Sequence, residues 1–221
     1  MEFVITADGS KTLYHAAVGE HYHSINGALQ ESKHVFQQAG LAYFLAQRET
    51  KACAILEVGF GTGLNFLMSA AYAEAHDVVL DYCGIEAYPL AEDVILATGY
   101  ADYVTPAVWS SFSKAYAPAL LDTVAFNASI QLKIATQKLT DFYTDKRFDV
   151  LYFDAFAAVH QPEMWTEEAL AHVCQFLAPG GVFVTYAITG NLKRAMKALG
   201  FAVEKAPGAP GKREMLRAVK L

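Results

Sequence analysis

The sequence is poor in the features that mark secreted, membrane-embedded and metal-binding proteins. Only three cysteines occur among 221 residues, Cys53, Cys83 and Cys174, and no two of them form a Cys-x-x-Cys pair. They predict neither a zinc site nor a disulfide framework, and free thiols in a reducing cytoplasm are the simplest interpretation. No apolar run approaches the roughly 20 residues that a membrane-spanning helix needs, so no membrane contact is expected.

Other absences narrow the class of protein further. The first eight residues show no basic start followed by a long apolar stretch, so no signal peptide is expected and a cytoplasmic location is predicted. No Gly-x-Ser-x-Gly occurs, which leaves Ser-His-Asp hydrolysis without its nucleophile elbow. Neither a repeat nor a linker divides the chain. Residues 1–50 are predicted to form a hairpin and a helix that pack on a catalytic domain at 51–221.

Charge is unevenly distributed along the chain. The formal net charge of −6 argues against strong nonspecific binding of nucleic acid by the whole surface. The segment from position 190 to the end, however, contains eight basic residues and only two acidic ones, Glu204 and Glu214. This basic segment is either an anion-binding face or the ordinary solvated surface of a last helix and strand.

Hydrophobic patterning predicts an open sheet with helices on both faces. Buried parallel strands read as continuous apolar runs, and the stretches 148–153 and 181–186 fit that description. Their alternation with helices implies a doubly wound α/β sheet. Strands are predicted at 3–7, 12–16, 53–58, 78–86, 129–135, 148–154, 180–187, 200–205 and 213–219, the first two around an Asp8-Gly9 turn. Helices are predicted at 33–48, 63–76, 91–99, 108–116, 138–144, 165–177 and 190–199.

A glycine-rich turn follows the first strand of that alternating pattern. Glu57 precedes Gly59, Gly61 and Gly63, which are spaced two residues apart, and a helical pattern begins at Leu64. Glycine permits positive φ there and lets a ligand approach the backbone. The spacing acidic-x-Gly-x-Gly-x-Gly is typical of S-adenosylmethionine (SAM) binding, whereas the nicotinamide fingerprint is Gly-x-Gly-x-x-Gly. An ordinary glycine-rich turn is the alternative.

Two carboxylates mark the carboxyl ends of later strands. Glu86 follows the second strand, about 20 residues beyond the glycines, where an acidic residue can accept both ribose hydroxyls. Asp154 ends the fourth strand and is expected to face the ligand crevice of an open sheet. It could accept a proton from an amine, orient that amine, or only cap a turn.

These motifs, taken together, resemble a known family over nearly the whole chain. The matching stretches are Tyr22-His23-Ser24 with Asn26-Gly27 and Glu31-Ser32, Glu57 through Leu67, Glu86 through Leu90, Asp154-Ala155-Phe156-Ala157, Pro162 through Trp165, Pro179-Gly180-Gly181 and Lys212-Arg213-Glu214-Met215. In these stretches the chain is similar to the methyltransferase domain of MnmC, a family of tRNA wobble-uridine modification enzymes.

The resemblance implies a class I SAM-dependent methyltransferase: a Rossmann-like α/β fold whose mostly parallel seven-stranded sheet has a reversed last strand. The implied reaction converts 5-aminomethyl-2-thiouridine at the tRNA wobble position to the 5-methylaminomethyl product, with the anticodon region as partner and Asp154 as catalytic residue. The implied cofactor-binding residues are Glu57, Gly59, Phe60, Gly61, Thr62, Gly63, Asn65, Glu86, Lys138 and Asp154. The implied substrate-binding residues are Tyr22, Ser24, Asn26, Glu31, Phe156, Lys212 and Arg213, and no metal is expected.

The chain also departs from the family pattern in three places. Gln137-Lys138 stands where the family usually has Gly-Asp near adenine, Ala158 replaces a loop proline, and the turn 208–211 reads Gly-Ala-Pro-Gly. Fused family members carry a flavin-dependent oxidase, so an FAD-dependent oxidase on a separate chain is a candidate partner. A small-molecule amine methyltransferase, a non-catalytic SAM- or RNA-binding module and, more distantly, a nicotinamide dehydrogenase stay open as alternatives.

Overall fold

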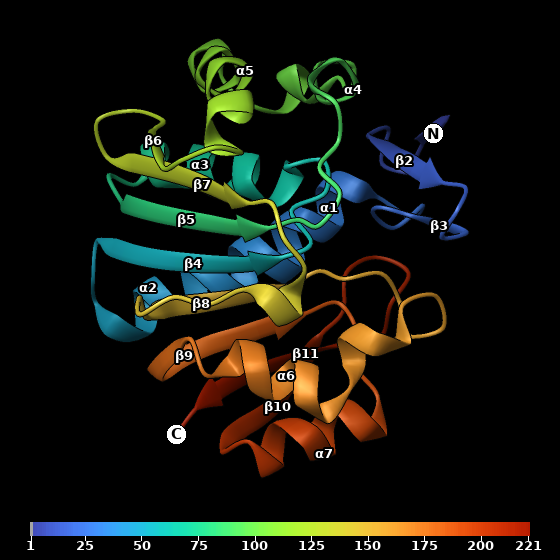
Figure 1. Ribbon diagram of the computed structural model, residues 1–221, viewed down its shortest axis with the longest axis vertical. Helices are drawn as coiled ribbons and strands as arrows, with labels where there is room; N and C mark the ends of the chain where they lie inside the picture. The colour runs from blue at the N-terminus through green and yellow to red at the C-terminus, as the bar shows by residue number, and fades with distance from the viewer. Residues whose placement is uncertain (1) are drawn as a thin grey trace.

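A mixed eight-stranded sheet runs through the centre of the protein (Figure 1). The computed structural model describes residues 2–221, so Met1 of the predicted N-terminal extension lies outside the described residues. The strands lie side by side in the order β10-β11-β9-β8-β4-β5-β7-β6. Their bounds are β4 Ala52–Val58, β5 Val79–Ile85, β6 Val124–Ala125, β7 Ile130–Ala135, β8 Phe148–Phe153, β9 Leu177–Thr185, β10 Phe201–Pro207 and β11 Glu214–Lys220.

The sheet is mostly parallel and its last strand is reversed, as the family resemblance implied. Strands β4, β5, β7, β8 and β9 pair in parallel, whereas β11 runs antiparallel to both of its neighbours, β9 and β10. The chain runs from β4 outward through β5 to β7 and then returns to β8 on the other side of β4. The strand order therefore reverses between β4 and β8, which is where an open α/β sheet binds its ligand.

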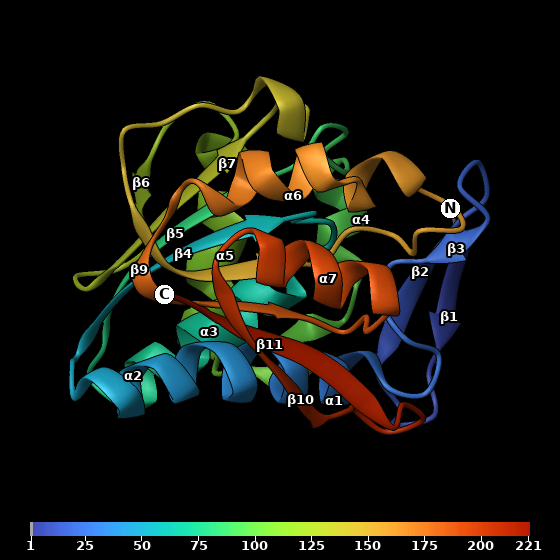
Figure 2. The same cartoon turned by 90° about the horizontal axis from the view of Figure 1, so that it is seen from below.

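Helices cover both faces of the sheet (Figure 2). One face carries α3 (Leu64–Ala75), α5 (Pro106–Ala119) and a long N-terminal helix, and the other carries α6 (Glu167–Cys174) and α7 (Gly190–Ala198). Threonine hydroxyls at 105, 166 and 189 accept the first free N–H groups of α5, α6 and α7, which fixes where these helices begin. Shorter helices are α4 Glu92–Leu96, η2 Tyr100–Tyr103, η3 Leu139–Asp141 and η4 Pro162–Trp165.

The N-terminal residues form a small separate sheet and then one continuous helix. The sheet consists of β1 (Glu2–Ile5), β2 (Lys11–His15) and β3 (Glu20–His21), all antiparallel. The Asp8 carboxylate accepts the backbone N–H of Ser10 in the hairpin turn and that of Gln30 in the following helix, at 3.0 and 2.9 Å. This small sheet lies at the carboxyl ends of the central strands (Figure 1).

The long helix packs closely on the sheet through Gly40. It comprises α1 (Ala28–Glu31), a π-helical stretch η1 (Ser32–Ala42) and α2 (Tyr43–Arg48). A methyl group built on Gly40 would lie 2.8 Å from a ring carbon of Tyr152 and 3.1 Å from Val184. Strands β8 and β9 thus leave no room for a side chain at this position.

Several boundaries differ from the sequence predictions. The long helix starts five residues before the predicted Lys33, and its middle is wound as a π-helix. The helix predicted at 138–144 is only the short η3, because five of its seven residues, at 140–144, are threonine, aspartate or aromatic residues with low helix propensity. The sheet has eight strands instead of seven because β6 adds a two-residue antiparallel edge strand.

Pro179-Gly180-Gly181, predicted as a turn before a strand, lies within β9, where the pairing with β8 shifts register. The three cysteines are all buried and form no disulfide among the described residues. Among residues 2–221, no helix is both long and apolar enough to cross a membrane.

The fit around Gly40 gives a stability prediction. Gly40→Val should lower the free energy of unfolding by about 1–3 kcal/mol, because the added side chain must displace Tyr152 or Val184 in a close-packed core. Urea denaturation measures the change. Gln38→Val on the same helix is the control, since it introduces the same side chain at an exposed position. Equal stability of the two variants would contradict the packing described here.

Candidate functional site

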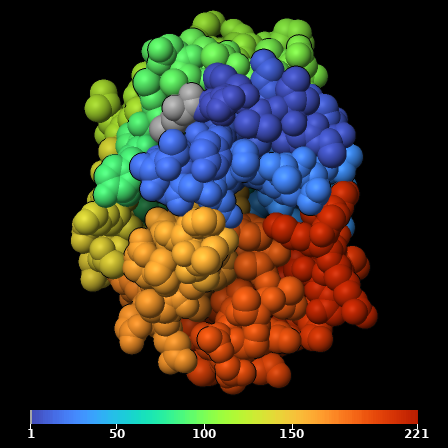
Figure 3. Space-filling model, turned by 90° about the vertical axis from the view of Figure 1, so that its right-hand side faces the viewer, coloured from blue at the N-terminus to red at the C-terminus, as the bar shows by residue number. Residues whose placement is uncertain are grey.

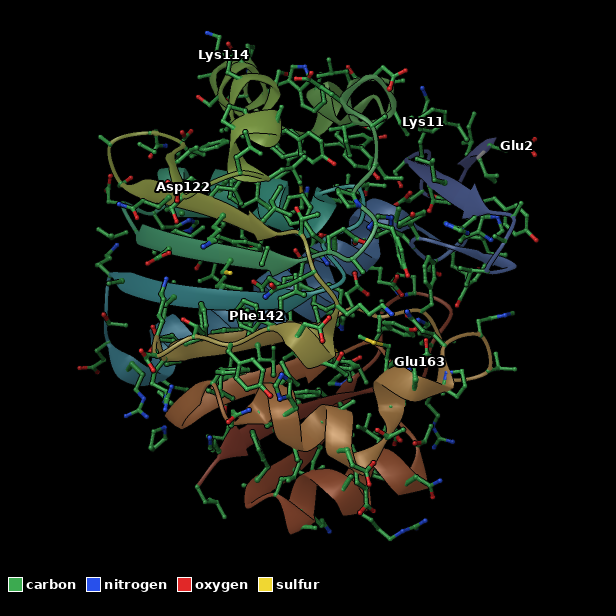
Figure 4. All side chains as sticks on the ribbon, in the orientation of Figure 1. Glu2, Lys11, Lys114, Asp122, Phe142 and Glu163 are labelled. Atoms are coloured by element: carbon green, nitrogen blue, oxygen red, sulfur yellow. The ribbon has the colours of Figure 1, made fainter. Side chains whose placement is uncertain are left out.

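A cavity of about 910 Å³ opens at the carboxyl ends of the central strands. Residues that follow β4, β5, β7, β8 and β9 form its floor, and the N-terminal residues 15–31 and the loop after β8 form its walls. Figure 3 faces this end of the sheet and shows the N-terminal residues, in blue, meeting the orange and red residues of the C-terminal half. In Figure 4, Lys11 of the hairpin and Glu163 of the β8–α6 loop lie on this side, whereas Asp122 lies at the opposite end of the sheet.

The glycine-rich turn forms part of the cavity floor. Gly59 has φ +83°, and a methyl group built on it would lie 2.5 Å from the backbone oxygen of Asp154. A methyl group on Gly61 would lie 2.9 Å from the Tyr22 ring, and the Gly61 N–H donates to the Glu86 carboxylate at 2.9 Å. Only glycine allows β4 and β8 to approach each other this closely and leaves the backbone open to a ligand.

A buried polar cluster lies directly beneath that turn. The side-chain nitrogen of Asn65 donates to Glu57 and to Asp154, both at 2.8 Å, and the Tyr82 hydroxyl donates to the other Glu57 oxygen at 2.8 Å. Glu57 comes from β4, Asn65 from the first turn of α3, and Asp154 from the end of β8. One amide group therefore joins two carboxyl groups and three elements of the fold.

Both carboxyl groups of this cluster have perturbed pKa values. Burial raises the pKa of Asp154 well above its usual range, and the neighbouring Glu31 raises it further. Burial likewise raises the pKa of Glu57, and the charge of Asp154 adds to that effect. Asp154 lines the cavity, so solvent reaches its carboxyl group there, whereas Glu57 is fully buried. Asp154 is thus suited to take up a proton from a ligand in the cavity.

Three polar and aromatic contacts join the N-terminal residues to the rest of the cavity wall. The Glu20 carboxylate accepts the Ala157 N–H at 2.8 Å, and the rings of Tyr22 and Phe156 meet edge to face with centroids 5.2 Å apart. The Lys212 ammonium donates to Glu31 at 2.8 Å and lies 3.9 Å from the centroid of the Tyr186 ring. Residues 181 positions apart in the chain thus meet at this wall.

The structure brings most of the predicted site residues together around the cavity. Those that line it are Tyr22, Ser24, Glu31, Gly59, Phe60, Gly61, Glu86, Lys138, Asp154, Phe156 and Lys212. Four others do not line the cavity and lie beneath the turn: Glu57, Thr62, Gly63 and Asn65. The Thr62 and Tyr100 hydroxyl groups share a hydrogen bond. Gly63 precedes α3 and packs against Phe112 and Phe60. Asn26 and Arg213 are exposed and do not line the cavity.

Three further residues at the site were not predicted from sequence. Glu20 and Tyr186 line the cavity, and Tyr186 also donates its hydroxyl to the Ala155 carbonyl at 2.9 Å. His23 is buried against the cavity, and desolvation lowers its pKa to about 4. The position of Tyr186 just after β9 was an available signal, because carboxyl ends of strands face the crevice. Neither Glu20 nor His23 carries such a signal.

The cavity has a strongly acidic lining. Five acidic side chains face it, those of Glu20, Glu31, Glu86, Asp154 and Glu163, against two lysines, Lys138 and Lys212. Burial and the negative charge of Glu86 raise the pKa of Tyr22 to about 12. Such a field favours a cationic ligand such as an ammonium or a sulfonium.

The raised pKa of Asp154 leads to a test of stability against pH. A carboxyl group whose pKa is higher in the folded than in the unfolded state stabilises the fold below its ordinary pKa of 3.8, and that contribution is lost as pH rises through the folded value. Asp154→Asn should therefore match the wild type near pH 4 and become more stable than it toward pH 8, by about 1 kcal/mol. Thermal unfolding across this range measures the difference, with the exposed Asp102→Asn as control.

The comparisons with known proteins agree with the geometry of this site. A protein of Chromohalobacter salexigens named tRNA 5-methylaminomethyl-2-thiouridine biosynthesis bifunctional protein MnmC is 32% identical, aligning with 95% of this chain and 31% of its own length. A Pseudomonas putida protein of the same name is 31% identical over 88% of this chain and 31% of its own length. The chain thus spans about a third of the length of these relatives.

Solved structures agree with these sequence matches. The crystal structure of MnmC2 from Aquifex aeolicus matches with a TM-score of 0.79 at 26% identity, covering 98% of this chain and 69% of that one. Streptomyces venezuelae DesVI matches with a TM-score of 0.52 at 14% identity over 87% of this chain and 92% of its own, and thereby supports the fold alone. These matches confirm the resemblance to MnmC that the sequence motifs indicated.

A family description completes the comparison. The family described as S-adenosyl-L-methionine-dependent methyltransferase matches residues 104–221, which is more than half of the chain. The matched part contains the Asp154 strand end, Tyr186 and the reversed last strand. The fold, the topological switch point and this match lead to one conclusion: the chain belongs to the S-adenosyl-L-methionine-dependent methyltransferases.

Proposed function

We propose that this chain methylates the primary amine of 5-aminomethyl-(2-thio)uridine at the wobble position of tRNA, with SAM as methyl donor. The observation that carries the proposal is the half-buried Asp154 carboxyl group, which lies in an acidic cavity beside the glycine-rich turn. The names of the MnmC relatives give the substrate class. The acidic lining adds independent support, since a cationic amine is the acceptor that it would attract.

The residues around the turn fit SAM. The cavity of about 910 Å³ can hold SAM together with a nucleobase. Gly59 and Gly61 leave the backbone accessible, because a side chain at either position would collide with Asp154 or Tyr22. The Glu86 carboxylate accepts the N–H groups of Gly61 and Tyr88 at 2.9 and 3.0 Å. We assign Glu86 to the ribose hydroxyls and Lys138, with Gln137, to the adenine side. Asn65, whose buried side-chain oxygen has no partner among the described residues, supports the turn from beneath.

The chain's own residues then prepare the acceptor amine. When bound, SAM supplies an electrophilic methyl group on a positively charged sulfur. An alkylammonium must lose one proton before its nitrogen offers a lone pair. The Asp154 carboxylate takes up that proton, and Asn65 holds the carboxylate in place through its 2.8 Å hydrogen bond. Tyr22 and Phe156 enclose the amine and exclude water, which aligns donor and acceptor.

We further propose roles for the two parts of the chain. Residues 1–50 act as an element that closes the cavity of the catalytic domain at 51–221, supported by the contacts of Glu20, Tyr22 and Glu31 with the opposite wall. Ser24 positions Glu31 by its N–H, at 3.0 Å, while Asn26 and Arg213 contact RNA at the rim. An FAD-dependent oxidase is the proposed partner, since the relatives are named bifunctional and about two thirds of their length lies outside the match.

Gly59 allows a direct test of the cofactor site. Gly59→Ala should weaken SAM binding at least tenfold, because its methyl group would force β4 away from the Asp154 carbonyl oxygen. Isothermal titration calorimetry measures the affinity. Gly9→Ala is the matched control: its φ of +82° imposes the same backbone strain, yet nothing lies within 4 Å of the added methyl. Comparable loss of affinity in both variants would point to strain alone.

The proposed reaction can be tested with a short RNA. The protein should transfer label from tritiated SAM to an anticodon stem-loop that carries 5-aminomethyluridine, but not to the same stem-loop with uridine. Asp154→Asn should lower kcat by about 10²–10⁴-fold at saturating SAM, because proton transfer from the amine is lost.

The possible outcomes separate the competing functions. Label in free alkylamines but not in the stem-loop would replace the tRNA proposal with a small-molecule amine methyltransferase. Unchanged turnover in Asp154→Ala would remove Asp154 from the mechanism. Binding of SAM with no transfer to either acceptor would favour a non-catalytic module.

A further inference from the structure

The contacts of Lys212 have the chemistry of an amine-recognition site. Its ammonium lies 2.8 Å from the Glu31 carboxylate and 3.9 Å from the centroid of the Tyr186 ring. A carboxylate and the face of an aromatic ring together are a common receptor for an alkylammonium. All three residues line the same cavity as Asp154.

The anionic part of this arrangement is more enclosed than the cationic part. The Glu31 side chain is 5% exposed and accepts the Ser24 N–H at 3.0 Å, and Tyr186 is fixed by its bond to the Ala155 carbonyl. The Lys212 side chain is 31% exposed and stands on the β10–β11 turn, beside Gly211 at φ +86°. A rigid receptor thus holds a cation that comes from a surface turn.

We propose that Lys212 is a built-in stand-in for the acceptor amine: its ammonium occupies the Glu31–Tyr186 site in the free protein and leaves when the substrate ammonium binds there. The lysine stem has four methylenes, so the bound group is chemically an alkylammonium, the same class as the aminomethyl group of the proposed substrate. This inference rests on the proposed function only in taking an amine as acceptor.

Displacement follows from the charges present. A second ammonium in the same site would lie within a few ångströms of the first and would be repelled by it. Lys212 must therefore move before the acceptor amine can contact both Glu31 and Tyr186. The incoming ammonium then makes the contacts with Glu31 and Tyr186 that Lys212 made before, so Tyr186 is a specificity residue for the amine.

The experiment removes the stand-in and offers a free amine. Lys212→Ala should bind n-butylammonium chloride with a millimolar or tighter Kd and show a rise in Tm, whereas the wild type should show neither at the same concentration. Sodium chloride controls for ionic strength. Lys205→Ala is the matched control, because it removes an ammonium that faces Glu214 at 3.7 Å on the open surface. Binding should weaken at least tenfold when Glu31→Gln is added and several-fold when Tyr186→Leu is added.

Several results would overturn the proposal. They are the absence of butylammonium binding in Lys212→Ala, equal binding in the wild type, or binding that survives the loss of Glu31. Lys212→Met, which keeps an apolar stem, serves as a second variant and should also bind the amine. If neither variant folds, Lys212 is a structural tie between two chain segments and cannot be a group that leaves. This binding experiment contains neither RNA nor SAM. Its result is therefore independent of the methyl-transfer experiment, and failure of this inference can be told apart from failure of the proposed function.

Discussion

The site depends on one amide group that holds two buried carboxyl groups. The Asn65 nitrogen bonds Glu57 and Asp154 at 2.8 Å each, and both carboxyl groups have raised pKa values. Such a cluster costs folding free energy, since burial and mutual repulsion both disfavour its charged form. It ties β4, α3 and β8 together at the topological switch point. The glycine-rich turn is held against this cluster, since a methyl group on Gly59 would lie 2.5 Å from the backbone oxygen of Asp154, and this sets where a ligand can lie.

The N-terminal residues form the part of the cavity wall that the central sheet does not provide. A Rossmann-like sheet alone offers an open edge at the carboxyl ends of its strands. Here the residues from Glu20 to Glu31 cover that edge and contribute acidic and aromatic groups of their own. Their contacts with Ala157, Phe156 and Lys212 involve two separate segments of the C-terminal half, the loop after β8 and the β10–β11 turn. Two of the five acidic side chains in the cavity, Glu20 and Glu31, thus come from the N-terminal residues and not from the sheet or its following loops.

The sequence predicted the parts of the fold that depend on local patterns. Parallel central strands are continuous apolar runs, so β4, β5, β7 and β8 were predicted to within about two residues. Glu86 and Asp154 followed from the rule that strand ends face the ligand. Glu57 shows the limit of motif reading: the motif places it with the cofactor site, yet the side chain lies beneath the turn and bonds Asn65 and Tyr82. Glu20 reaches the site through tertiary packing, which no local pattern in the sequence records.

The charge of the cavity constrains how an RNA could use it. A cavity with five acidic and two basic side chains repels phosphate, so the proposed RNA substrate would insert a base with its cationic side arm while its backbone stays at the rim. The eight basic residues after position 190 do not all serve that rim. Lys205, Lys212 and Arg217 pair with glutamates, and Lys220 donates to two backbone carbonyls. Lys193, Arg194, Lys197 and Arg213 form no ion pair among the described residues, so under the proposed function they are the groups left to bind phosphates. In that proposal, selectivity for the amine and affinity for the RNA come from different surfaces, which adjoin at the β10–β11 turn where Lys212 and Arg213 are neighbours.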